Sequence, residues 1–124
     1  MREHDVVIVP SRHGYAEGLP NTIYEGLASR SPLIISDHPA FRGRLAPEAE
    51  CLVFEAEAPG ALAAQLARLA DDPVLYAALS EASERAVGGL YVGMEWEALI
   101  TAFLADPEDK DGWVRENSLA GLGL

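Results

Sequence analysis

Three short, continuously apolar runs stand out in the first half of the chain. They occupy residues 5–10, 32–36 and 51–54, and each is bounded by Pro, Ser, Asp or Glu. A continuous apolar run of this length is typical of a strand that is buried on both faces of a parallel sheet. Residues 37–44, which contain His38-Pro39 and Gly43, predict a loop with one short helical turn.

Helical patterns separate and follow these runs. Asn21 suits an N-cap for a helix between the first two runs, with Ile23 and Leu27 on its apolar face. The last helix carries Trp96 and Phe103 on one strongly apolar face. Helices are expected over residues 22–29, 61–70, 74–87 and 94–104.

The order of these elements predicts an α/β fold with a parallel sheet. Because three strands are fewer than a complete doubly wound half contains, we expect a partial Rossmann-like domain, a small parallel sheet flanked by helices. This domain is expected over residues 1–105. The polar, Gly-rich residues 106–124 are expected to form a poorly ordered tail, in which Trp113 and residues 119–122 either dock on a partner or are loose.

Charge and composition exclude several classes of function. The 124 residues carry 9 basic and 20 acidic side chains, a net charge of −11, which disfavours binding to nucleic acid or anionic lipid. No apolar run is long enough for a transmembrane segment, and no signal peptide is evident, so a cytoplasmic location is expected. The single cysteine, Cys51, lies in an apolar run and is expected to be a small buried side chain. The three histidines lack the spacing of metal ligands, so no metal is expected.

The candidate ligand-binding residues are concentrated in the loop over residues 11–21, directly after the first predicted strand. Ligands of open α/β sheets bind beyond the carboxyl ends of the strands. The start of the following helix offers the unpaired N–H groups of Asn21, Thr22 and Ile23 to a phosphate, and Gly18 allows close approach of the backbone.

Two carboxylates flank this helix start. Glu17 lies just before it and Glu25 one turn inside it, with seven residues between them. Glu17 is placed to accept hydrogen bonds from sugar hydroxyls, and Glu25 to bind a ribose diol. The spacing alone leaves a plain alternative open, in which Asn21 only caps the helix and Glu25 is only a solvated side chain.

The motif Glu-Gly-Leu-Pro-Asn-Thr-Ile-Tyr-Glu (residues 17–25), between a Pro-Ser strand end and a Pro-Leu-Ile-Ile strand, resembles the C-terminal domain of family-4 (group 1) glycosyltransferases. These are retaining enzymes of the GT-B fold. The resemblance continues through Cys51-Leu-Val-Phe54, Asp71-Asp72-Pro73 and Met94-Glu-Trp-Glu97, and covers about residues 5–105.

This resemblance implies that the domain binds a nucleotide-diphosphate sugar as donor substrate and needs no cofactor. It assigns Glu17 to the donor sugar's hydroxyls, as the catalytic residue, and Glu25 to the nucleotide ribose. The other residues that it places at the donor are Ser11, His13, Gly18, Leu19, Asn21 and Thr22. For Ser11 and His13, and for Asp37 and His38 after the second strand, a structural role competes with donor contact.

The chain departs from the family pattern in one respect. In this family an Arg and a Lys neutralise the donor diphosphate and an N-terminal domain binds the acceptor, and we expect neither to precede Asp5. We therefore expect the isolated chain to transfer no sugar, and the strand at residues 6–9 to be a bare edge that forms a homodimer or pairs with a partner chain supplying the missing half. Two alternatives stay open: a degenerate, non-catalytic binding or oligomerisation module, and another Rossmann-like nucleotide domain such as a sugar-nucleotide epimerase.

Overall fold

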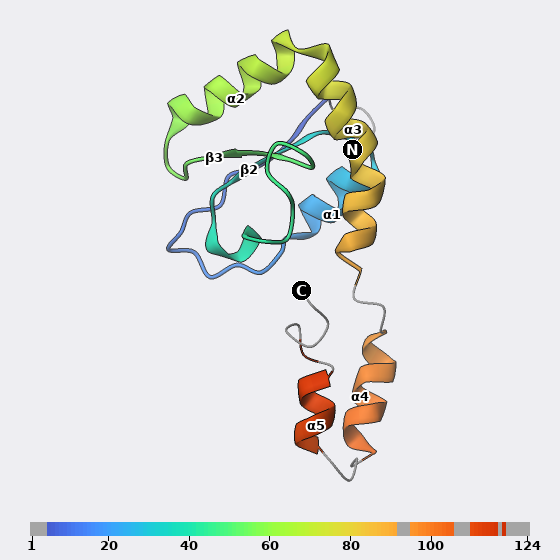
Figure 1. Ribbon diagram of the computed structural model, residues 1–124. Helices are drawn as coiled ribbons and strands as arrows, with labels where there is room; N and C mark the ends of the chain where they lie inside the picture. Colours follow the sequence, from blue (N-terminus) through green and yellow to red (C-terminus); the bar gives the residue numbers. More distant parts are fainter. Residues whose placement is uncertain (1–4, 92–94, 106–109, 117, 119–124) are drawn as a thin grey trace. The chain divides into compact units, whose positions relative to one another are not determined.

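The computed structural model describes residues 5–91, 95–105, 110–116 and 118 (Figure 1). The chain divides into two compact units, Met1–Leu90 and Tyr91–Leu124. The predicted domain over residues 1–105 and tail over residues 106–124 are not tested by this division and stay predictions.

The first unit is built on a three-stranded sheet. Strands β1 (Val7–Val9), β2 (Leu33–Ser36) and β3 (Leu52–Phe54) are all parallel and lie in the order β1-β2-β3. The four residues of the central strand β2 are all buried, as the continuous apolar run predicts. The small parallel sheet expected from the sequence is therefore confirmed.

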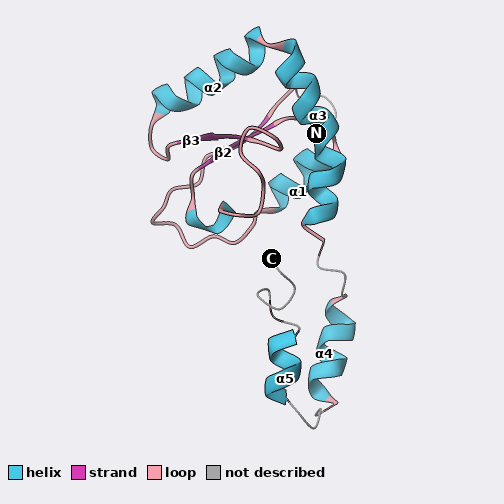
Figure 2. Cartoon of the chain, in the orientation of Figure 1, coloured by secondary structure: helices cyan, strands magenta, loops and turns pink. Residues whose placement is uncertain are grey.

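Helices cover both faces of this sheet (Figure 2). Helix α1 (Asn21–Ala28) packs on one face, where its Ile23 and Leu27 join side chains from all three strands in one core. Helix α2 (Pro59–Asp71) packs on the other face through Leu69. Helix α3 (Pro73–Gly89) contributes to both cores, with Leu79 in the second and Ala86 in the first. The fold class is thus α/β with flanking helices, as expected.

The helix starts differ from the sequence prediction at one important point. Asn21 is the first residue of α1 rather than its N-cap, because the extended Pro20 holds the cap position and its carbonyl oxygen accepts a 3.0 Å hydrogen bond from the N–H of Ile23. The predicted capping role of Asn21 is therefore wrong. Helix α3, in contrast, has a side-chain cap, since the Asp72 carboxylate accepts hydrogen bonds from the N–H groups of Val74 and Leu75.

The second unit contains two helices, α4 (Trp96–Leu104) and α5 (Lys110–Glu116). No residue of α4 is buried, and its apolar Trp96 and Leu104 are 74% and 73% exposed. Met94, where this helix was expected to begin, and residues 119–122 lie outside the described residues, as does the side chain of Trp113. The seven-residue helix α5 falls within the tail, where the polar sequence predicted none.

Candidate functional site

Three loops follow the carboxyl ends of the three strands: residues 10–20 after β1, residues 37–38 leading into the short 3-10 helix η1 (Pro39–Phe41) after β2, and residues 55–58 after β3. The end of β2 is joined directly to the first loop, because the Ser36 hydroxyl donates a 2.8 Å hydrogen bond to the carbonyl oxygen of Ser11. This bond lies at the edge of the sheet that the sequence singled out.

A hollow of about 510 Å³ lies between the end of β1, the first loop and the start of α1. This volume falls within the range of small-molecule sites. The hollow brings together three of the predicted site residues, Ser11, Glu17 and Thr22. Its remaining lining residues are Ile8, Val9, Pro10, Arg12, Tyr15 and Pro20.

Glu17 is the most informative residue of this hollow. Its side chain is half-buried, and its Oε2 atom is buried without a hydrogen-bond partner among the described residues. A buried carboxylate oxygen without a donor costs free energy, so buried polar atoms in proteins nearly always have a partner. Because Glu17 lines the hollow and a carboxylate only accepts hydrogen bonds, its position suits a ligand that brings hydroxyl donors.

The start of α1 supplies donors of its own. The N–H groups of Asn21 and Thr22 precede the first intrahelical bond, and neither donates to another group in the part of the chain that the structure describes. The N–H of Ile23 was expected to be a third free donor, but it donates to the Pro20 carbonyl, so that expectation is wrong. Glu25 is exposed and lies one turn beyond Thr22 on the same helix face.

The other predicted donor-site residues lie around the hollow without lining it. The His13 ring donates from Nε2 to the Oδ1 atom of Asp37 at 2.6 Å. The half-buried Leu19 packs against the core that contains Ile23 and Leu27 of α1. Gly18 is exposed, with no heavy atom within 4 Å of a Cβ built on it. The assignments of these residues to the donor stay predictions.

Asp37 and His38 hold the loops in place. The Oδ1 atom of Asp37 also accepts a 2.9 Å bond from the N–H of Ala56, in the third loop. This bond, followed by that from His13, lowers the pKa of Asp37. The Nδ1 atom of His38 accepts from the N–H of Ala40, a turn-forming role that the sequence had raised. Their links to the first loop were not predicted, because only the fold brings these segments together.

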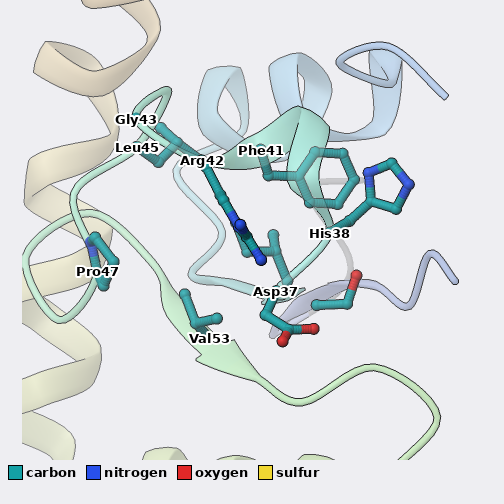
Figure 3. A pocket seen from close by; sticks show the side chains of 10 residues that line it. Asp37, His38, Phe41, Arg42, Gly43, Leu45, Pro47 and Val53 are labelled. Atoms are coloured by element: carbon teal, nitrogen blue, oxygen red, sulfur yellow. The ribbon is translucent and has the colours of Figure 1, made fainter. Parts of the chain in front are cut away.

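A second, smaller cavity of about 200 Å³ lies beside the loop after β2 (Figure 3). Its lining is mainly apolar, with Phe41, Leu45 and Val53 among its residues, and the Arg42 side chain extends across it. Apart from Asp37 and His38, which the sequence analysis had weighed for the cleft, its residues were not singled out from the sequence.

Few cations or potential metal ligands surround the first hollow. Arg12 is the only basic side chain that lines it, and its Nε atom lies 3.8 Å from a carboxylate oxygen of Glu57. Within the described residues, no group of three or more His, Cys, Asp or Glu side chains is arranged to hold a metal ion. Over those same residues, no helix is long and apolar enough to cross a membrane.

Comparisons with known proteins agree with this architecture. The family model described as "Glycosyl transferases group 1" matches residues 1–72, more than half of the chain. A solved structure of sucrose-phosphate synthase from Thermosynechococcus elongatus is similar, with 27% sequence identity and a TM-score of 0.64. The match covers 82% of this chain but only 24% of that one, and no curated protein gives a significant match. The α/β fold thus matches a GT-B glycosyltransferase structure, and the chain belongs to the group 1 glycosyltransferase family.

Proposed function

We propose that the unit Met1–Leu90 binds the donor substrate of a retaining glycosyltransferase, a nucleotide-diphosphate sugar whose sugar passes to an acceptor. The observation that carries this proposal is the half-buried Glu17 carboxylate, whose Oε2 atom has no hydrogen-bond partner among the described residues, in the lining of a hollow large enough for such a ligand. Family membership supports the same function.

Glu17 has the chemistry to hold the donor sugar. A carboxylate only accepts hydrogen bonds, and a hexose presents several hydroxyl donors on one ring. Bonds to an ionised carboxylate are stronger than neutral ones, so Glu17 orients the sugar ring through few contacts. Fixing the ring in this way prepares its anomeric carbon for attack by a positioned acceptor.

The diphosphate and the ribose are assigned to α1. The free N–H groups of Asn21 and Thr22 point out of a helix N-terminus, where the helix dipole favours negative charge. Glu25, one turn further along, accepts both hydroxyls of the ribose diol. In this arrangement sugar, diphosphate and ribose follow the line from the first loop along α1.

Binding and transfer are separate requirements. Transfer needs stabilisation of the negative charge that develops on the departing nucleotide diphosphate, and an acceptor held near the sugar. Of the described residues that line the hollow, only Arg12 is basic. We therefore propose that this chain by itself binds the donor without transferring its sugar, and that another protein segment or partner chain supplies the acceptor site.

The test is a titration of the 124-residue chain with UDP-, GDP- and ADP-sugars, followed by ligand-observed NMR. We expect one nucleotide base to bind selectively. Glu17→Gln and Glu25→Gln each remove charged hydrogen bonds, and are expected to weaken binding by roughly ten- to a hundredfold. Glu84→Gln, at an exposed position of α3, is the matched control and is expected to bind as the wild type does. Failure of every nucleotide sugar to bind at millimolar concentration would contradict the proposal.

The position of β1 favours a second candidate, a non-catalytic module that associates through its sheet edge. Among the described strands, β1 pairs only with β2, so its other side is an edge on which a second copy of the chain could add a strand. Such a module forms a homodimer whether or not a donor binds. Light scattering of the purified chain at increasing concentration tests this candidate, and a monomer at the highest concentration would contradict it.

A further inference from the structure

Three consecutive residues at the end of β2 each bind the loop between β1 and α1. The Ser36 hydroxyl donates to the Ser11 carbonyl at 2.8 Å, Asp37 accepts from the His13 ring at 2.6 Å, and His38 Nε2 lies 3.0 Å from the Tyr15 carbonyl oxygen. The bonded loop positions are alternate ones, 11, 13 and 15. We refer to these three bonds as the loop clasp.

The hydrogen-bond partners of His38 indicate which ring nitrogen donates and which accepts. Nδ1 accepts from the N–H of Ala40 at 3.2 Å, so the ring hydrogen is on Nε2 and is donated to the Tyr15 carbonyl. The side chain is 4% exposed, and its ring packs 5.1 Å from that of Phe41 (Figure 3). His38 is therefore a buried bridge between η1 and the first loop.

The first loop depends on contacts of this kind for a fixed conformation. It runs from Pro10 to Pro20 without regular secondary structure, and loops of this length are mobile unless other segments hold them. Glu17 lies two residues beyond Tyr15, the last position that the loop clasp holds. The clasp thus ends immediately before the carboxylate that is proposed to bind the donor sugar.

Asp37 extends the same connection to the third loop. Its Oδ1 atom accepts from both the His13 ring and the N–H of Ala56, while its own N–H donates to the Phe54 carbonyl at the end of β3. One residue therefore links segments that follow all three strands.

We propose that His38, together with Asp37, is a positioning residue, which fixes the first loop so that Glu17 meets the donor sugar. This inference rests on the proposed donor-binding function. Neither residue touches the donor in this arrangement. His38 acts on the first loop through its bond to the Tyr15 carbonyl, and Asp37 acts through its bond to the His13 ring.

Two substitutions separate the two bonds of His38. In His38→Asn, the amide oxygen takes the place of Nδ1 and still caps Ala40, but no donor reaches Tyr15. In His38→Gln, the amide nitrogen takes the place of Nε2 and keeps the bond to Tyr15. We expect the Asn variant to increase the fast motion of residues 12–18, measured by heteronuclear NOE without ligand, and to weaken nucleotide-sugar binding about five- to tenfold. The Gln variant is expected to keep both properties close to wild type.

Measuring both loop motion and nucleotide-sugar binding makes a failure of this proposal distinguishable from a failure of the proposed function. Equal loop motion and equal binding in the Asn variant and the wild type would overturn the loop clasp, as would a Gln variant that behaves like the Asn variant. If the wild type binds no nucleotide sugar, the proposed function fails, and loop motion alone decides whether the clasp exists. His13→Ala, at an exposed position, should loosen the same residues, so the test does not depend on folding of the His38 variants.

Discussion

Gly26 of α1 lies directly against Leu33 of β2, so closely that a Cβ atom built on the glycine would be 2.6 Å from the Leu33 Cδ2 atom. The same Cβ would be 3.3 Å from the Val7 Cβ atom on β1. A side chain at this position would push the helix away from the sheet. Because Glu25 and Thr22 lie on the same short helix, this close packing also sets where they stand relative to the strands.

Gly26→Ala is therefore expected to destabilise the chain. Overpacking of a core typically costs about 1–3 kcal/mol, which exceeds the higher helix propensity of alanine. Urea unfolding followed by circular dichroism measures the change. Gly88→Ala in α3, where nothing lies within 4 Å of the built Cβ, is the matched control and should leave stability unchanged or raise it by up to about 1 kcal/mol. Equal midpoints for the two variants would disprove the tight contact.

Glu17→Gln should separate stability from binding. The substitution replaces a charged carboxylate, one of whose oxygens is buried without a partner among the described residues, by a neutral amide of the same shape. Because the desolvation of a charge is removed, the free energy of unfolding is expected to stay the same or rise by up to about 1 kcal/mol. Urea unfolding of both proteins measures this. A clear loss of stability would mean that Glu17 has a structural role, contrary to its proposed role in binding.

The Cys51 thiol should react only slowly with thiol reagents in the folded chain. The thiol is 0% exposed, and its burial, with smaller effects from Glu50 and Glu48, raises its pKa from 9.0 to about 12. The reactive thiolate is thus ~1,000-fold scarcer at pH 8 than for an ordinary thiol. Reaction with DTNB should be slow in buffer and complete in guanidinium chloride. An exposed thiol at Ala63→Cys, in a Cys51→Ala background, provides the control and should react at once.

The free energy of unfolding should fall at acidic pH, partly because Asp37 becomes protonated. The Ala56 N–H and then the His13 ring lower its pKa below the ordinary value of 3.8. Since the folded state has the lower pKa, the stabilising contribution is fully present above pH 3.8 and is lost as the pH falls through the folded-state pKa. We expect Asp37→Asn to lose less unfolding free energy than the wild type between pH 6 and pH 3.

Urea unfolding at the two pH values measures this difference. Asp71→Asn, at an exposed position, controls for the loss of one negative charge. An identical pH dependence in Asp37→Asn and the wild type would show that the Asp37 bonds contribute nothing to stability.

Sequence patterns were sufficient to predict the main strands and helices of the first unit. The run at residues 32–36 is apolar nearly throughout because β2 is covered on both faces, and a run this short favours a buried strand over a helix. Helix starts were less predictable. Asn21 has the side chain of a good N-cap, yet Pro20 holds that position in an extended backbone conformation, and its carbonyl oxygen accepts a hydrogen bond from the N–H of Ile23.

Some features of the candidate site could also be predicted from the sequence, and others could not. Glu17, Ser11 and Thr22 were found from the sequence because they lie in one loop and its following helix, so that local spacing brings them to one hollow. The same reasoning placed His13 in this loop with either a structural role or a donor contact, but it did not predict that the ring binds Asp37, 24 positions away in the chain. No local pattern encodes a partner at that distance.

The sequence by itself determined the strands, the helices that cover them and the family, because each depends on short-range periodicity or on a contiguous motif. The tertiary structure alone decided that Oε2 of Glu17 is buried without a partner among the described residues, that Gly26 touches the sheet, and that residues 36–38 hold positions 11, 13 and 15. These features arise when parallel strands bring distant loops to the same edge, where hydrogen bonds depend on distances between atoms rather than on the order of residues.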